Sequence, residues 1–224
     1  FGIVDLASLP KDRYYLYRSQ WNKNDSTLHI LPHWNWAGRE GEVTPVFVYT
    51  SYPKAELFIN GKSQGIREKN DSTLQTRTRL MWNETVYEPG EVKVVAYDEK
   101  GNPAAEKSIR TAGKPHHLVL TTNRKTLDAN GDDLAYITVQ VADKDGNIVP
   151  TDSRAVKFSV KGAGSFEATA NGDPTSLRSF QKPEMDLFSG AATAIVRSSK
   201  EGGKLNFTAT TKGVKPATIS IDVK

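Results

Sequence analysis

Apolar and polar residues alternate through most of this chain, beginning near Thr27 and continuing to its end. Because successive side chains of an extended strand point to opposite faces, a period of two predicts half-buried β-strands. The strands expected on this pattern cover residues 27–31, 43–51, 55–59, 91–97, 107–111, 117–122, 135–142, 155–160, 191–197, 205–211 and 217–223. Short strands at this spacing, separated by polar turns, predict an all-β protein built from immunoglobulin-like β-sandwiches.

One segment near the start follows a helical pattern instead. Pro10 suits a first helical position, and Asp12 would place a carboxylate in the first turn, where it favours the helix dipole. Tyr14, Tyr17 and Trp21 recur at helical spacing and predict one apolar stripe. We therefore expect a single short helix before the first strand.

Turn signals divide the strands into two groups. Asn60-Gly61 can adopt the positive φ angles of a type I′ hairpin turn, and Gly113-Lys114-Pro115 is typical of a linker. The segments VKVVAYDEKGNPAAE (92–106) and ITVQVADKDGNIVPT (137–151) share a strand, an acidic turn and a second strand. A chain of 224 residues is long enough for one or two domains of roughly 150 residues. We expect a helical segment over 1–22 and two tandem sandwiches over 23–113 and 114–224.

Composition excludes several classes of protein. Hydrophobic residues make up 37% of the chain and charged residues 25%, a mixture that can bury a core. The net charge of +4 comes from scattered basic residues rather than a patch, so we expect no nucleic-acid partner. There is no cysteine, which excludes disulfides and thiolate metal sites. No apolar run approaches the ~18 residues of a membrane span.

Two short motifs suggest chemistry, and each has a simpler interpretation. Asp143, Asp145 and Asn147 resemble the opening of a calcium loop, but Val149 and Pro150 follow where a further acidic ligand would be needed. We therefore favour a hairpin turn and expect no metal and no cofactor.

The dipeptide Asn83-Glu84 resembles the acid/base motif of retaining glycosidases, whose mechanism needs a second carboxylate about 5 Å away. No alternation of helices and strands surrounds it, so we expect no catalytic residue in the chain.

The stretch LPHWNWAGREGE holds the densest aromatic cluster, with His33, Trp34, Asn35 and Trp36 in succession. Both tryptophans have even numbers, as do Leu28 and Ile30, so an extended chain would place all four on one face. Pro32 interrupts a central strand and makes the continuation an edge or a loop. The residues alone leave two accounts open: the tryptophans pack the base of the first sandwich, or one indole is presented to a sugar.

Residues FGIVDLASLPKDRYYLYRSQW, then LHILPHWNWAGREGEVTPVFVYTSYPKAELFINGKSQG, closely resemble the region that follows the catalytic barrel in bacterial β-galactosidases of glycoside hydrolase family 2. The second half, with YITVQVADKDGNIVP, FSVKGAGSFEATANGDPTSLRSFQ and LFSGAATAIVRS, is similar to the C-terminal immunoglobulin-like domain of those enzymes. The resemblance covers nearly the whole chain. Its first block of motifs is the more specific, since bacterial adhesin repeats share the D-x-x-G-N-x-V-P hairpin of the second.

This resemblance implies that residues 1–22 are the closing helix of a (β/α)₈ barrel and that the chain is excised from a longer, periplasmic or secreted enzyme. The parent enzyme would hydrolyse β-galactosides with two upstream glutamates, and the sandwiches would support the barrel and contribute to homo-oligomer contacts. Trp34 or Trp36 would line the sugar pocket, with Trp34 slightly preferred because it lies nearer Pro32, and His33 and Asn35 would add polar contacts. A carbohydrate-binding module and an adhesin-type structural repeat are the alternatives.

Overall fold

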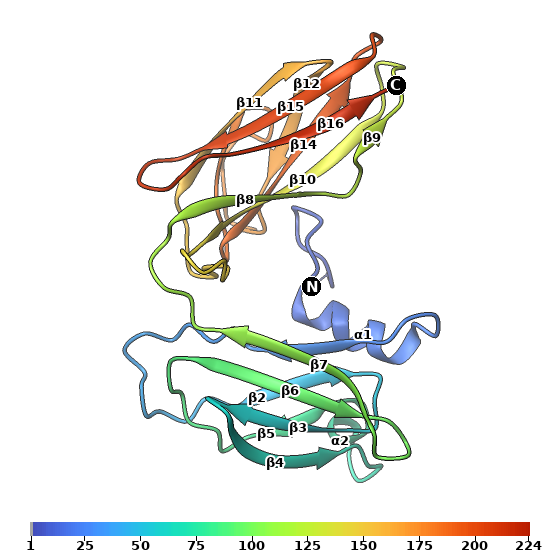
Figure 1. The fold of residues 1–224 in the computed structure, drawn as a ribbon, viewed down its shortest axis with the longest axis vertical. Coiled ribbons are helices and arrows are strands. Elements are labelled where there is room, and N and C mark those ends of the chain that lie inside the picture. The colour runs from blue at the N-terminus through green and yellow to red at the C-terminus, as the bar shows by residue number, and fades with distance from the viewer. Residues whose placement is uncertain (1) are drawn as a thin grey trace. The chain divides into compact units, whose positions relative to one another are not determined.

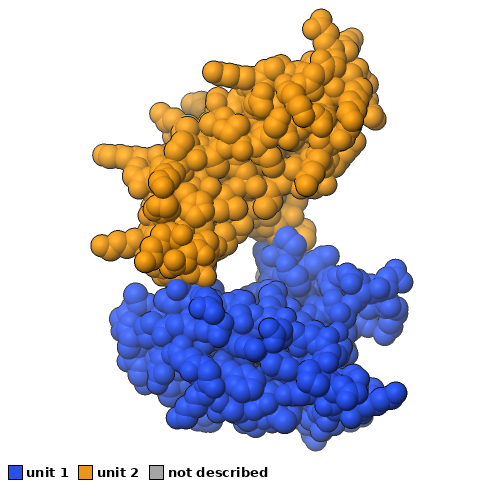
Figure 2. All heavy atoms as spheres, in the orientation of Figure 1, with its two compact units in different colours: residues 1–3, 10–111 blue, residues 4–9, 112–224 orange. Residues whose placement is uncertain are grey.

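The computed structural model describes residues 2–224, which form two compact units (Figures 1 and 2). The first unit comprises residues 2–3 and 10–111, and the second comprises residues 4–9 and 112–224. The first unit contains, in order, α1 (Asp12–Trp21), β1 (Leu28–Leu31), β2 (Val46–Thr50), β3 (Lys54–Ile59), β4 (Lys62–Glu68), α2 (Leu74–Thr78), β5 (Leu80–Trp82), β6 (Glu91–Tyr97) and β7 (Pro103–Arg110).

The first unit is a sandwich of two antiparallel sheets, ordered β1-β2-β5 and β4-β3-β6-β7. In β3 and β6 every second residue is buried, as the alternation predicts. These residues form one core with Ile30, Val46, Val48, Leu80 and Trp82 from the facing sheet. Burial of this apolar surface between the sheets is the main force that holds the unit together.

Helix α1 differs in two details from the helix that the sequence predicts. It begins at Asp12 with Lys11 as its N-cap, so Pro10 precedes the helix. Tyr15 faces the sheet, where its ring stacks on His29 of β1 with centroids 3.9 Å apart. The predicted stripe lies farther round the helix, because Tyr17 stacks on Trp21 at 4.8 Å and the Trp21 side chain is 72% exposed. The helix therefore keeps an aromatic face open to solvent.

The second unit is also a sandwich, with sheets ordered β12-β14-β10-β8 and β13-β11-β15-β16-β9. Its strands are β8 (His117–Thr122), β9 (Thr126–Leu127), β10 (Leu134–Ala142), β11 (Ala155–Gly162), β12 (Gly164–Ala170), β13 (Glu184–Asp186), β14 (Ala191–Ser198), β15 (Gly203–Thr210) and β16 (Ala217–Val223). All pairs are antiparallel except β9 with β16. The predicted fold class, an all-β chain of tandem sandwiches with a preceding helix, is confirmed. Neither helix of residues 2–224 has the length and apolarity needed to span a membrane.

The hairpin between β3 and β4 shows how one turn connects distant segments. Asn60 and Gly61 have φ angles of 48° and 78°, which confirms the predicted turn. The Asn60 side chain accepts a hydrogen bond from the Glu91 backbone N–H at 2.8 Å and donates to the Pro89 carbonyl at 3.2 Å. A Cβ at Gly90 would lie 1.9 Å from Asn60 Oδ1, so only glycine allows this approach.

Candidate functional site

The segment His33–Trp36 leaves the sheet where β1 ends at Leu31 and enters an irregular loop that lasts until β2. Pro32 follows through a cis peptide bond, so the strand does not continue. The loop turns at Gly38, which has a φ of 86°, and the Arg39 N–H donates to the Trp36 carbonyl at 2.9 Å. This turn brings the Arg39 side chain back beside the Trp36 ring.

Trp34 is part of the core of the first unit. Its side chain is 1% exposed, and its ring makes an edge-to-face contact with Tyr87 at 5.2 Å. The indole N–H donates to the Glu88 carbonyl at 2.9 Å, which satisfies the polar atom of a buried ring. The Trp34 carbonyl accepts from the Thr111 hydroxyl at 2.5 Å. Within this unit the Trp34 ring therefore has no face available for a ligand.

Trp36 lies only partly in that core. Its ring stacks on His33 with centroids 4.4 Å apart, and the Arg39 guanidinium lies over it at 5.4 Å. Cation–π contacts of this kind contribute about 0.5–1 kcal/mol at exposed sites. In the described chain the Trp36 indole nitrogen has no hydrogen-bond partner although the atom itself is buried. A buried N–H without an acceptor is rare in a folded protein.

The neighbours of Trp36 supply polar groups. Burial lowers the pKa of His33, and the negative charge of Asp12 opposes this only in part, so the ring is mainly neutral at neutral pH. His33 Nδ1 accepts from the Asn35 backbone N–H at 3.2 Å, which places the ring proton on Nε2. Arg39 also pairs with Glu42 at 2.8 Å across an exposed surface. We name His33, Trp36 and Arg39 the aromatic corner.

The two accounts of this segment apply to different residues. Leu28 and Trp36 pack against the core from outside, while Ile30 and Trp34 are inside it. All four residues thus contribute to one core, but for Trp34 and Trp36 this follows from the path of the loop, because the strand ends at Leu31. The position of Pro32 favours Trp34 over Trp36 as the sugar-facing residue, whereas the burial of Trp34 leaves Trp36 as the better candidate. Arg39 was missed, and the available signal was its position three residues after Trp36 across a glycine turn.

The structure confirms the predicted hairpin turn at Asp143. Asp143 Oδ1 accepts from the backbone N–H groups of Asp145 and Asn147, both at 2.9 Å. Its Oδ2 accepts from the Asn147 side chain at 3.0 Å and the Gly113 N–H at 2.7 Å. Four donors already occupy this carboxylate, which leaves little lone-pair capacity for calcium.

The first unit repeats this turn. Asp98 accepts from the Lys100 and Asn102 backbone N–H groups at 2.9 and 2.8 Å and from the Asn102 side chain at 3.2 Å. The sequence echo between 92–106 and 137–151 therefore reflects one hydrogen-bonded turn built twice.

Acid is expected to destabilise the second unit through Asp143. Burial alone would raise the pKa of Asp143, but hydrogen bonds from Asn147, Gly113 and Asp145 outweigh it and lower the pKa to about 2. Because the folded-state pKa lies below the unfolded value, the stabilisation is complete above pH ~4 and is lost as the pH falls toward ~2. Urea titrations from pH 5 to 2 should show a smaller pH dependence in Asp143→Asn than in the parent chain. Equal pH dependence in both proteins would contradict this role.

The remaining candidate residues form no catalytic or metal constellation. Glu84 lies exposed in the turn after β5. Among residues 2–224, no group of three or more His, Cys, Asp or Glu side chains is placed to hold a metal ion. The aromatic corner is consequently the candidate site that carries most structural support.

Comparison with known protein families finds one match in each unit. Residues 118–220 match the family described as glycoside hydrolase family 2 C-terminal domain 5, and residues 41–105 match a domain of unknown function, DUF4982. The β-galactosidase BoGH2A of Bacteroides ovatus is 40% identical over all 224 residues, which are 25% of that protein. A putative β-glucuronidase of Formosa agariphila is 31% identical over 89% of the chain and 19% of that protein.

A solved β-glycosidase from Bacteroides vulgatus superposes with a TM-score of 0.91 at 31% identity, covering 100% of this chain and 28% of that one. The chain spans a quarter or less of the length of the two curated relatives named above. The family model, the relatives and the solved structure agree. The chain therefore belongs to glycoside hydrolase family 2 and corresponds to the C-terminal region of its members.

Proposed function

We propose that the chain is the non-catalytic C-terminal part of a retaining glycoside hydrolase that cleaves terminal β-galactosides. Similarity to the β-galactosidase of Bacteroides ovatus along the whole chain supports this substrate over the glucuronides named for the more distant relatives. The two catalytic glutamates would lie upstream, at the C-terminal face of a (β/α)₈ barrel. Catalysis would then require residues outside this chain.

The first contribution of the chain would be to support the barrel through helix α1. The exposed face of α1, with the Tyr17–Trp21 stack and a 72% exposed Trp21, suits burial against the barrel. Exposed aromatic pairs of this size contribute strongly when they are buried at an interface. The opposite face of α1 is fixed to the first sandwich through Tyr15 and His29. The helix would thus connect the barrel to the sandwich.

The second contribution would be one wall of the sugar pocket, formed by the aromatic corner. The observation that carries this proposal is the Trp36 indole, whose N–H has no partner in the described chain and whose ring is incompletely buried. The apolar face of a sugar could lie against the exposed part of the ring, and a sugar hydroxyl would accept from the buried N–H only after the loop shifts to uncover it. His33 and Asn35 lie beside it in the loop and would provide further polar contacts. Stacking on the ring would require the Arg39 guanidinium to move or to share the surface.

The isolated chain is expected to show no turnover of a chromogenic β-galactoside, because both catalytic glutamates would be absent. The longer enzyme, assayed at the same molar concentration, should release the chromophore readily. The measurement is the absorbance change over several hours with chain purified from a host that lacks its own β-galactosidase. Turnover that copurifies with the chain and disappears in Glu84→Gln would overturn the non-catalytic assignment.

A further inference from the structure

The outer face of the five-stranded sheet of the second unit is polar and contains no aromatic side chain on β11 or β15. Val156, Phe158, Leu205, Phe207 and Ala209 of these strands are buried, so the alternate residues point outward. The outward residues are paired across the two strands as Lys157 with Thr210, Ser159 with Thr208, and Lys161 with Asn206. We name these six residues the polar face.

The polar face ends in a shallow groove at the start of β11. This groove is lined by Arg154, Ala155, Lys157, Thr210, Thr211 and Lys212. Its floor is fixed, because the Thr211 hydroxyl donates to the Ala155 carbonyl at 2.7 Å and Arg154 donates to the Lys212 carbonyl at 3.0 Å. Lys157 lies on β11, and Lys212 lies in the turn between β15 and β16, where its carbonyl accepts from Arg154.

Charges around the groove are unevenly balanced. Asp152 forms an ion pair with Arg154 at 2.7 Å, and Asp186 forms one with Arg178 at 2.8 Å. Glu184 lies opposite Lys157 in the strand register, but its ion pair is with Arg178, at 3.4 Å. In the described part of the chain the lysines that form ion pairs are Lys93 and Lys204, so the groove presents Lys157 and Lys212 without a partner anion.

We propose that the polar face and its groove bind an acidic polysaccharide made of uronic acids. Lys157 and Lys161 lie four residues apart on one side of β11, which separates their Cα atoms by about 13 Å. Hydroxyl and amide groups fill the space between them. A uronic acid polymer has carboxylates for the cations and hydroxyl groups for these hydrogen-bonding side chains, and the lysine spacing would meet only some of its carboxylates. A nucleic acid would require denser charge or aromatic side chains for base stacking. The role is independent of the one proposed for Trp36, which lies in the other unit.

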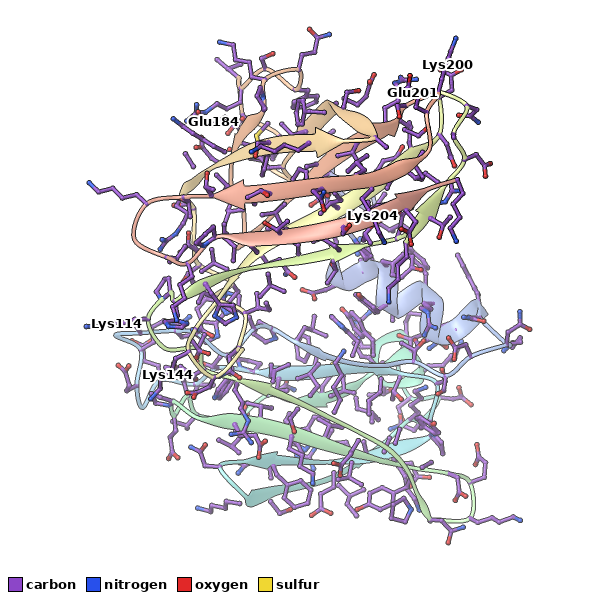
Figure 3. The ribbon with its side chains drawn as sticks, turned by 45° about the horizontal axis from the view of Figure 1, so that its top comes forward. Lys114, Lys144, Glu184, Lys200, Glu201 and Lys204 are labelled. Carbon is purple, nitrogen blue, oxygen red and sulfur yellow. The ribbon has the colours of Figure 1, made fainter. Side chains whose placement is uncertain are left out.

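Affinity electrophoresis of the whole chain through gels containing polygalacturonate tests this proposal. We expect retardation that weakens as sodium chloride is raised, because exposed charges are screened. The double variant Lys157→Ala/Lys212→Ala should bind about tenfold more weakly, the scale of two exposed ion pairs. The matched control Lys144→Ala/Lys200→Ala removes the same charge from exposed turns outside the face and should bind like the parent chain; Figure 3 labels Lys144 and Lys200, with Lys204 and Glu184 of the sheet.

Several outcomes would overturn the proposal. These are the absence of retardation, an equal loss in the control variant, equal retardation by neutral β-1,4-galactan, and tighter binding to heparin or duplex DNA than to polygalacturonate. Circular dichroism should show that each variant is folded. If the alanine pair is unfolded, Lys157→Gln/Lys212→Gln keeps the length of both side chains and gives the same test.

Discussion

Replacing Trp34 by alanine is expected to lower the free energy of unfolding of the first unit by about 3–5 kcal/mol, the range for an aromatic residue removed from a packed core. The ring is 1% exposed and touches Tyr87 edge to face, so its removal leaves a cavity between the sheets. The Glu88 carbonyl would also lose the indole donor at 2.9 Å. Urea unfolding followed by far-UV circular dichroism measures the change, with each unit fitted as its own transition.

Trp21→Ala is the matched control, because the same side chain is removed from a site that is 72% exposed. We expect its effect to stay within about 0.5 kcal/mol, as for most surface substitutions. Trp34→Phe should fall between the two, since it retains an aromatic ring but loses the indole N–H. A loss in Trp34→Ala no larger than that in Trp21→Ala would show that Trp34 is not a core residue in solution.

Strands with a regular apolar alternation were predictable from the sequence, and three of them match at both ends. The expected bounds 91–97, 117–122 and 217–223 are those of β6, β8 and β16. In β6 each apolar residue of the alternation lies in the core, so the pattern and the packing contain the same information. Asn60-Gly61 was predictable for a related reason, because a two-residue hairpin with both φ angles positive demands those residue types.

The missed strands lack that alternation. Strand β4 has no buried residue, β5 spans three residues, and β12 contains a register shift between Phe166 and Ala168. Each is held in place by its neighbours: β4 pairs with β3 along an edge, and the Trp82 indole donates to the Gly65 carbonyl at 2.9 Å. Tertiary hydrogen bonds, rather than a hydrophobic period, specify such strands, and a single sequence does not contain that information in local form.

The candidate site illustrates the same limit. The sequence predicted an aromatic cluster at the end of the first strand, and that cluster exists. It could not distinguish Trp34 from Trp36, because the distinction depends on partners far along the chain. Trp34 is held by Glu88 and Thr111, which are 54 and 77 residues away. Helix α1 shows the same effect, since the inward position of Tyr15 is determined by His29 of the sheet.

In the longer enzyme, Trp36→Ala is expected to reduce kcat/KM for a β-galactoside by at least about tenfold. The loss of one apolar sugar contact is typically equivalent to ~1–3 kcal/mol of transition-state stabilisation. The lost N–H adds to this effect if a sugar hydroxyl is its acceptor, because that atom has no acceptor in the described chain. Steady-state kinetics with a chromogenic substrate, combined with unfolding curves of the same preparations, would separate loss of activity from loss of structure.

Trp36→Phe provides the decisive comparison, since it keeps a flat apolar ring and removes only the indole nitrogen. If stacking dominates, Trp36→Phe should recover most of kcat/KM; if the N–H dominates, it should resemble Trp36→Ala. Arg39→Ala removes the guanidinium that lies 5.4 Å from the centre of the Trp36 ring. We expect kcat to stay unchanged and KM to fall, because the cation no longer competes with the sugar for the ring. Unchanged kinetics in Trp36→Ala would mean that Trp36, like Trp34, only packs the first sandwich, and the proposed aromatic wall would be wrong.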